Sequence, residues 1–334
     1  MDVFCYLSVG RIYALHHLSP YLHTYLSLPQ DSFFPALRDI IWVDKFTPYG
    51  PIAIYLNGLI AWLSATKIST AILGFKLLAL TTHGLNAWIM YRLWGQKGFW
   101  LYAFNPLIIF ELLTNNHNEG IVLFLLLLGL LCLTSKKILA GWWAYIAAVS
   151  TKVSAIIFLP FYFLVALKEK RPDQKIKFII SAIFGALIIS IVLYYPLTAG
   201  NWWALWGGLK AQANQAIPAF YSPLITIFQI GFDFFHVSNA ANWGIIAGRG
   251  FFLLIYLLLL IKLWFGAKKQ PLSYYLTAAY GTLCLSALTW LMPWYLVILI
   301  TLLIIEYRRQ NNVWMLFFYY LASLYGVAYY LSLR

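Results

Sequence analysis

The amino-acid sequence predicts an all-α protein, a polytopic transmembrane helical bundle with extracytoplasmic juxtamembrane helices. Composition is the first indication: 63% of the 334 residues are hydrophobic and only 10% are charged, whereas soluble domains carry about 25% charged residues. The second is the recurrence of apolar segments along the chain, separated by short basic loops. We expect about ten spans and a multi-pass protein of the cell membrane, that is, an inner or plasma membrane.

The distribution of charge predicts which loops face the cytoplasm, because lysine and arginine concentrate in cytoplasmic loops. The loops that we assign to this side hold 14 of the 23 basic residues and three of the ten acidic ones, a net charge of +11 against +2 elsewhere. Their basic residues are Arg92, Lys97, Lys136, Lys137, the cluster at 168–177, Lys262, Lys268, Lys269, Arg308 and Arg309. No basic face or binding motif accompanies the overall charge of +13, so we expect no nucleic-acid partner.

The chain is expected to have two parts. Residues 1–70 form a polar extracytoplasmic loop with juxtamembrane helices, and residues 71–334 form the transmembrane helical domain, which includes an outer loop at 198–244. The charge assignment also predicts two hairpins that turn on the outer side, at 150–153 and 292–295. The polar features of the chain should therefore converge on the outer face.

The first polar feature is Asp2, which is followed one helical turn later by Tyr6. Residues four apart share one face of a helix, so the carboxylate and the phenol should point together. A carboxylate at this place could act as a general base on a hydroxyl group. The alternative interpretation is a frayed and solvated chain terminus.

The second feature is a tight polar turn at residues 115–119, which reads Asn-Asn-His-Asn-Glu between two apolar segments. Ionisable groups in spans usually face a cavity, which favours a functional site; a solvated connecting loop is the alternative. Glu111, one to two turns earlier, is interpreted as snorkelling to the membrane interface.

The third feature is Lys152, the only charged residue between Ile138 and Leu167. A lone lysine in an apolar setting should face a water-filled site or an anion, and a phosphate would satisfy it well. The alternative is a cytoplasmic lysine within one broken helix, which would place the basic cluster at 168–177 outside.

The fourth feature is the aromatic and basic character of the loop at 198–244 and its flank. An interfacial belt is the favoured interpretation of such aromatic residues, with stacking on a sugar ring as the alternative. The residues concerned are Trp202, Trp203, Trp206, Lys210, Trp243 and Arg249. The histidines are scattered without metal-ligand spacing, so we expect no metal site.

Several motifs in order along the chain resemble the polyprenyl-phosphate-mannose-dependent mannosyltransferases, a bacterial family of the GT-C class of membrane glycosyltransferases. Residues 1–51, which we call the head, carry the pattern D-x-x-x-Y-x-x-x-G-R from Asp2, followed by S-P-Y, L-R-D and Y-x-P. The stretches NPLIIFELLTNNHNEG and STKVSAIIFLP, and then Pro293-Trp294-Tyr295-Leu296, are also similar to family motifs.

The resemblance implies inverting transfer of a sugar, with mannose as the first choice, from a polyprenyl phosphate to a glycan or glycolipid on the extracytoplasmic face. Asp2 is implied as the general base and Glu119 as the acidic residue of a second loop. The implied substrate-binding residues are Tyr6, Arg11, Tyr49, His117, Asn118, Lys152 and Arg249. No cofactor is implied, because the lipid-linked sugar phosphate is itself the donor; the other expected partners are the acceptor and membrane lipids.

Departures from the family pattern leave alternatives open. Cys5 and Val9 stand where arginine and an acidic residue are usual, which leaves the donor geometry and the sugar undecided. The family has a span before its catalytic loop, whereas this sequence starts at the loop, so we expect either that its start is misassigned or that it is a fragment of a longer chain. A lipid-linked sugar flippase or other transporter, and a scaffold that has lost its activity, are the alternatives to an enzyme.

Overall fold

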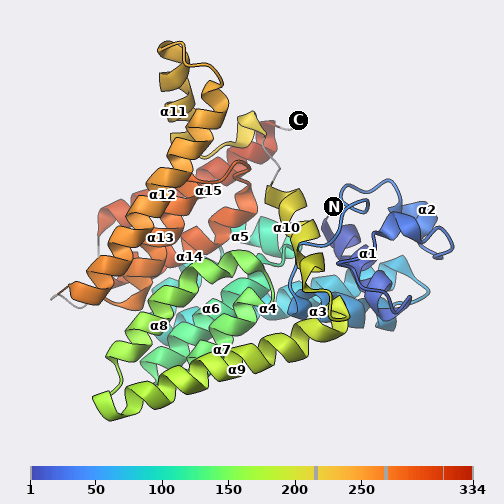
Figure 1. Ribbon diagram of the computed structural model, residues 1–334, viewed down its shortest axis with the longest axis horizontal. Helices are drawn as coiled ribbons and strands as arrows, with labels where there is room; N and C mark the ends of the chain where they lie inside the picture. Colours follow the sequence, from blue (N-terminus) through green and yellow to red (C-terminus); the bar gives the residue numbers. More distant parts are fainter. Residues whose placement is uncertain (1, 214–216, 267–269, 311, 333–334) are drawn as a thin grey trace. The chain divides into compact units, whose positions relative to one another are not determined.

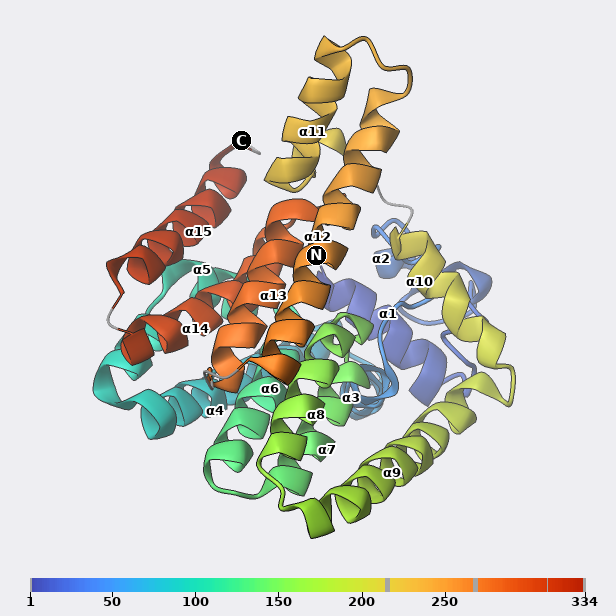
Figure 2. The ribbon, with the colours of Figure 1, turned by 60° about the vertical axis from the view of Figure 1, so that its left-hand side comes forward.

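The computed structural model describes residues 2–213, 217–266, 270–310 and 312–332. Within these ranges every regular element is a helix, and the β-type pairing is an isolated antiparallel bridge between Tyr49 and Lys152 (Figures 1 and 2). The predicted all-α, polytopic class is confirmed. Of the residues assigned to the cytoplasm, Lys268 and Lys269 lie outside the described ranges.

The helices form two units, of which the first comprises residues 1–90, 109–156 and 171–214. It contains the head and most of the polar features singled out in the sequence. Its helical elements are α1 (Asp2–Ala14), η1 (Tyr25–Ser27), α2 (Phe34–Leu37), α3 (Pro51–Leu63), the first part of α4 (Ile68–Ala103), the π-helical turn η2 (Phe110–Thr114), α6 (Glu119–Thr134), α7 (Ile138–Val149), the start of η3 (Val153–Phe158), α9 (Pro172–Thr198), η4 (Trp202–Ala204) and α10 (Leu205–Ala213).

The second unit comprises residues 91–108, 157–170 and 215–334. Helices α11 and α12 pack against each other in it, as do α13 and α14 and then α14 and α15. Its elements are the end of α4, α5 (Pro106–Ile109), α8 (Leu159–Lys168), η5 (Pro218–Phe220), α11 (Pro223–Phe234), α12 (Ala240–Phe265), α13 (Leu272–Ser286), α14 (Pro293–Gln310) and α15 (Val313–Ser332).

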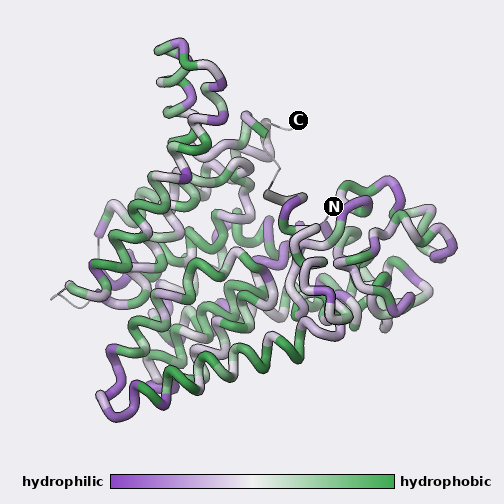
Figure 3. Tube along the Cα trace, in the orientation of Figure 1, coloured by the Kyte–Doolittle hydropathy of each residue, from purple (hydrophilic) through white to green (hydrophobic). Residues whose placement is uncertain are grey.

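Among the described residues, four helices are long and apolar enough to cross a membrane: α4, α9, α12 and residues 313–330 of α15. A fifth candidate is the segment from Pro106 to Thr134, which is bent by 117° at the break between Thr114 and Glu119. Figure 3 shows that α9 is apolar beyond its polar first turns and that α12 is apolar over most of its length. The remaining expected spans fall on helices of 18 residues or fewer, so the count of about ten stays a prediction.

The head has its own apolar core, built mainly where α1 packs against α3. Side chains that are almost fully buried there include Tyr6, Leu7 and Tyr25. Gly10 makes this close packing possible, because a Cβ atom at its position would lie 2.2 Å from the carbonyl oxygen of Asn57. The core holds α1 as a rigid element, which fixes the direction of the polar side chains at its two ends.

Candidate active site

Helix α1 begins at Asp2 and presents Asp2 and Tyr6 on one face toward the polar turn at 115–118. Oδ2 of Asp2 lies 3.0 Å from Nδ1 of His117. The backbone N–H of Asn118 donates to the Tyr6 hydroxyl at 3.4 Å. The structure therefore brings together residues that lie more than a hundred positions apart in the sequence.

His117 contacts a second carboxylate on its other side. Its Nε2 lies 3.1 Å from Oε2 of Glu111, whose side chain is 0% exposed. A neutral imidazole carries one N–H only, so both carboxylate contacts are satisfied at once only by the protonated ring. Asp2, His117 and Glu111 thus form a carboxylate–imidazolium–carboxylate chain.

The local backbone explains how Glu111 and His117 come to face each other. Glu111 lies in the π-helical turn η2, a rare element that often marks functional sites. The His117 N–H then donates to the Glu111 carbonyl at 3.1 Å, across a break in which Asn116 has a φ of 62°. Asparagine tolerates this left-handed conformation better than most residues. The interpretation of Glu111 as a snorkelling residue is wrong, because the π turn directs it inward.

The charges of Asp2, His117 and Glu111 shift one another's pKa values. Burial alone would raise the pKa of Asp2, but the hydrogen bond and the positive charge of His117 lower it below its usual value. For His117, burial would lower the pKa, and the hydrogen bonds to Asp2 and Glu111 raise it to about 9. At neutral pH the Asp2 carboxylate is therefore ionised and the imidazole is protonated.

Lys152 lies beside this chain and is paired with the buried carboxylate of Glu119. The anion that the sequence required for this lysine is thus supplied by the protein itself. Tyr49 and Lys152 form an antiparallel bridge, which continues as a hydrogen bond of 3.0 Å from the Gly50 N–H to the Thr151 carbonyl. A Cβ atom on Gly50 would lie 2.3 Å from the carbonyl oxygen of Ser150, so the middle position of the Y-x-P motif has no room for a side chain.

Tyr49 lies between these groups. Its ring packs edge-to-face on Tyr6, with 5.4 Å between the centroids. The ammonium group of Lys152 lies 5.9 Å from the centre of the Tyr49 ring, within the range of a cation–π interaction. The two tyrosines join the Asp2–His117 pair to the Lys152–Glu119 pair; we call this set of residues, with Glu111 and Asn118, the acid–base cluster.

Two buried polar atoms of the acid–base cluster have no hydrogen-bond partner among the described residues: Oε1 of Glu111 and Nδ2 of Asn118. Buried polar groups are nearly always hydrogen-bonded, and exceptions are common where a ligand or an ordered water belongs. Asp2 is also the most exposed of the three residues Asp2, His117 and Glu111, with 28% of its side chain accessible. The cluster is therefore buried, charged and incompletely satisfied.

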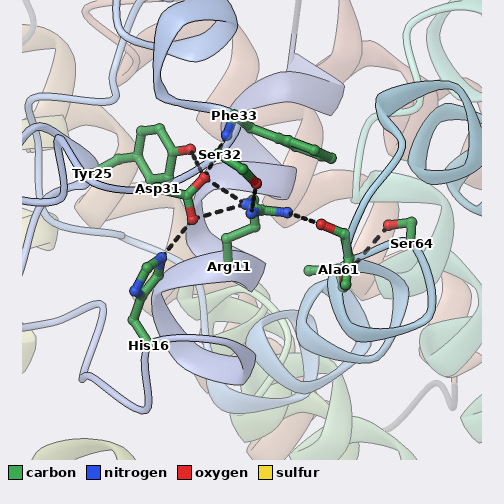
Figure 4. A network of polar contacts seen from close by, with 9 residues as sticks. Arg11, His16, Tyr25, Asp31, Ser32, Phe33, Ala61 and Ser64 are labelled. Carbon is green, nitrogen blue, oxygen red and sulfur yellow. Dashed lines mark hydrogen bonds and ion pairs between the residues drawn. The ribbon is translucent and has the colours of Figure 1, made fainter.

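Arg11, at the other end of α1, is not in the acid–base cluster. Its guanidinium donates to Asp31 at 2.9 Å, to the Ser32 hydroxyl at 3.0 Å and to the Ala65 carbonyl at 3.1 Å, and it lies over the Phe33 ring (Figure 4). With 3% of the residue exposed, Arg11 has no face left for a phosphate in this conformation. Arg11 and Lys152, both implied by the family resemblance as substrate-binding residues, thus have different partners in the structure.

Asp31 is the partner that the sequence did not reveal. Its carboxylate accepts hydrogen bonds from Arg11, from the Tyr25 hydroxyl at 2.6 Å and from the Phe33 N–H at 2.8 Å, and it contacts His16 (Figure 4). Burial alone would raise the pKa of Asp31, but these hydrogen bonds lower it to about 2. We call these residues the Arg11–Asp31 network.

Arg249 and the aromatic loop residues are not members of the acid–base cluster. Arg249 belongs to α12 in the second unit. Trp203 and Trp206 are 79% and 60% exposed, as expected for interfacial residues. Trp202 lines a pocket of the first unit, beside Tyr49.

Fold and site together define a polytopic α-helical membrane protein with a buried acid–base cluster in its N-terminal half. Comparison with known families gives a more particular result. Residues 1–168, which contain the whole cluster, match the family alpha-(1->6)-mannopyranosyltransferase, N-terminal domain. The chain belongs to this mannosyltransferase family, which confirms the resemblance seen in the sequence.

Curated relatives extend the similarity beyond the matched domain. The chain is 24% identical to alpha-(1->6)-mannopyranosyltransferase A of Corynebacterium glutamicum, over 90% of its own length and 66% of that protein. It is 25% identical to alpha-(1->6)-mannopyranosyltransferase A of Mycobacterium tuberculosis, over 65% of its own length and 44% of that protein. The chain thus spans less than two thirds of these relatives. No solved structure matches.

Proposed function

We propose that the protein is a membrane mannosyltransferase of the GT-C type, which transfers mannose from a polyprenyl-phosphate donor to a hydroxyl group of a glycan or glycolipid on the extracytoplasmic face. The observation that carries this proposal is the ionised Asp2 carboxylate, held at 3.0 Å by a protonated His117 within the family's own domain. A charged carboxylate that is partly exposed at the edge of a buried site is suited to remove a proton from an incoming hydroxyl.

The proposed reaction is a single displacement. Asp2 accepts the proton of the acceptor hydroxyl as its oxygen forms a bond to the anomeric carbon of mannose. The bond between that carbon and the phosphate oxygen breaks on the opposite face, and the polyprenyl phosphate leaves with the electron pair. Such a displacement inverts the anomeric carbon. Because the relatives are named for alpha-(1->6) transfer, we propose a β-linked donor and an α-linked product.

His117 and Glu111 act on Asp2 in this scheme. The protonated imidazole keeps Asp2 ionised and fixes its orientation, while the buried Glu111 keeps the imidazole protonated. A base held in one orientation needs no rearrangement when the acceptor arrives. Both residues are positioning residues, because neither is placed to touch the reacting atoms.

Lys152 is the proposed partner of the leaving phosphate, since it is the lysine of the acid–base cluster and no arginine belongs to that cluster. Fixed positive charge stabilises the negative charge that develops on a leaving group. In the structure the Lys152 ammonium group is paired with the Glu119 carboxylate. The donor phosphate therefore has to bind Lys152 together with Glu119 or displace Glu119 from it. Arg11 is proposed as a structural residue of the head, because Asp31 already holds it.

The proposal is tested with the full chain in lipid nanodiscs. The donor is mannosyl phosphate β-linked to a polyprenol, and the acceptor is an α-1,6-linked mannose oligosaccharide. We expect one new α-linked mannose per polyprenyl phosphate released, removable by α-mannosidase, and no reaction with the α-anomer of the donor. Movement of the donor across a vesicle membrane without any mannose transfer would overturn the proposal in favour of a flippase, and neither transfer nor movement would favour a scaffold.

A further inference from the structure

The first unit contains a pocket of about 240 Å³ directly beside the acid–base cluster. Tyr49 belongs to both, and Gly50 and Val153 flank the bridge between Tyr49 and Lys152. The pocket is lined by side chains from the head, from α9 and from η4 and α10: Tyr21, Pro48, Tyr49, Gly50, Val153, Ser190, Tyr194, Trp202, Leu205 and Leu209. Nothing in the proposed reaction uses this pocket.

The walls of the pocket are apolar in effect, although they include three tyrosines. The Tyr21 hydroxyl donates to the Tyr49 carbonyl at 2.8 Å, and the Tyr194 hydroxyl is hydrogen-bonded to Ser150. Tyr49 is likewise hydrogen-bonded to Tyr6, so all three phenols already have a partner. A ligand rich in hydroxyl groups would lose hydrogen bonds to water there without replacing them.

The pocket also adjoins the lipid-facing surface of a span. Ser190 and Tyr194 lie one turn apart on α9, near its end at Thr198. Their neighbours Ile191 and Val192 are exposed on the same apolar helix, at 45% and 64%, and α9 is a membrane-span candidate. A chain that leaves the pocket along α9 therefore passes into the bilayer.

We propose that this pocket binds the phosphate-proximal part of the donor's isoprenoid chain. The assignment rests on the proposed function and deepens it. The phosphate lies at Lys152, the first part of the chain passes Tyr49 into the pocket, and the rest runs along α9 into the membrane. A volume of about 240 Å³ is below the roughly 300–1,000 Å³ of sites for whole small ligands, so only a short stretch of the chain is enclosed.

A pair of tryptophan variants tests the assignment. Ser190→Trp fills the pocket, while Val192→Trp adds the same side chain about 200° around the same helix, on the side away from the pocket and from the path proposed for the chain. We expect Ser190→Trp to raise the KM for the polyprenyl donor about tenfold or more, because apolar burial of the chain is lost. Val192→Trp and the KM for the oligosaccharide acceptor should stay within about twofold.

Photolabelling gives a readout that does not depend on transfer. The probe is a polyprenyl phosphate with a diazirine on the isoprene unit next to the phosphate. We expect labelled peptides from α9 and α10 in the wild type and in Val192→Trp, and their loss in Ser190→Trp. Labelling elsewhere on the chain, or equal labelling of α9 in both variants, overturns the assignment.

The outcomes separate this inference from the proposed function. A wild-type enzyme that transfers mannose while Ser190→Trp leaves the donor KM unchanged refutes the pocket alone. A Ser190→Trp variant in which the acceptor KM rises instead assigns the pocket to a sugar. A wild-type chain that binds the photoprobe in the pocket and transfers no mannose refutes the proposed reaction and leaves the lipid site in place.

Discussion

Helix α1 carries a buried charge network at each end, and the two differ in how far they are satisfied. At its C-terminal end, the guanidinium of Arg11 finds a carboxylate, a hydroxyl, a carbonyl and an aromatic ring. At its N-terminal end, the acid–base cluster leaves Glu111 Oε1 and Asn118 Nδ2 without partners among the described residues, and Asp2 partly exposed. The same helix thus holds one network that is complete and one that is not.

The difference teaches how to separate a structural ion pair from a candidate site. Both contain an acid, a histidine and a base, and both are buried, so residue types alone do not distinguish them. A complete network stabilises one arrangement and gains nothing from a ligand. An incomplete one has polar atoms whose desolvation is uncompensated until something binds, and here it also adjoins a pocket.

The largest effect on stability should come from the complete network. Arg11→Met leaves Asp31 buried without its main charge partner, and breaking a buried pair from one side costs about 3–5 kcal/mol. Thermal unfolding in detergent measures this loss. Arg38→Met is the matched control, because its pair with Asp39 is exposed and should contribute less than about 1 kcal/mol.

The Arg11 comparison can also fail. A stable Arg11→Met protein whose donor KM is raised would assign Arg11 to the donor phosphate. The Arg11–Asp31 network would then bind substrate, as the acid–base cluster is proposed to do. Should Arg11→Met not fold, Arg11→Lys retains the charge and is expected to fold with reduced stability, because lysine cannot reproduce the forked contacts.

The next effect concerns Lys152, which has to be changed together with Glu119. Lys152→Gln alone would leave a buried carboxylate unpaired, so the Lys152→Gln/Glu119→Gln pair is the informative variant. We expect it to fold and to bind the donor about 10- to 150-fold more weakly, the equivalent of a charged hydrogen bond of about 1.5–3 kcal/mol. Steady-state kinetics with varied donor measure this, with the exposed Lys45→Gln as control. An unchanged donor KM in the folded double variant would contradict the role of Lys152.

A smaller effect should appear in the pH dependence of stability. The pKa of Asp31 is lowered to about 2 from 3.8, so its contribution is fully present above about pH 4 and is lost as the pH falls through 2. The lost contribution is about 2 kcal/mol. Unfolding measured between pH 2 and pH 6 should show a gap between the wild type and Asp31→Asn that closes at the acid end. A stability difference between the two proteins that stays constant over this pH range would contradict the assignment of the effect to ionisation of Asp31.

The smallest effect should come from Glu111→Gln, which keeps a hydrogen-bond acceptor for His117 and removes the charge. The pKa of His117 is raised to about 9 by its two carboxylates, so activity supported by the protonated ring is present below that value and is lost as the pH rises through it. In Glu111→Gln we expect this alkaline limit to move to lower pH and the rate near pH 8 to fall about tenfold. A rate that falls equally at all pH values would indicate a purely structural role.

Part of this picture could be predicted from the sequence. Composition gave the all-α membrane class, and the spacing of four placed Asp2 and Tyr6 on one helix face. The isolation of Lys152 predicted a water-filled site or an anion beside it. That the anion is Glu119 depends on where α6 begins after the bend. Charge-based topology brought residues 2, 115–119 and 152 to the same side, and the structure has them in contact.

Other parts could not be predicted, for physical reasons. Asp31 lies in an irregular loop, where no periodicity indicates which side chain turns inward, so its pairing with Arg11 was not foreseen. Glu111 looked like an interfacial residue because its sequence reads as a regular helix, whereas the π turn rotates it toward His117. Both surprises come from backbone irregularities that hydrophobic patterns do not encode.

The central claim, that the incomplete network at Asp2 holds the general base, is tested most directly by the transfer rate of Asp2→Asn. The variant should unfold at the wild-type temperature and transfer mannose about 100- to 10,000-fold more slowly, with the donor KM little changed. Asp39→Asn, on an exposed carboxylate of the same head, should retain the wild-type rate. A folded Asp2→Asn protein that transfers mannose as fast as Asp39→Asn would contradict the claim.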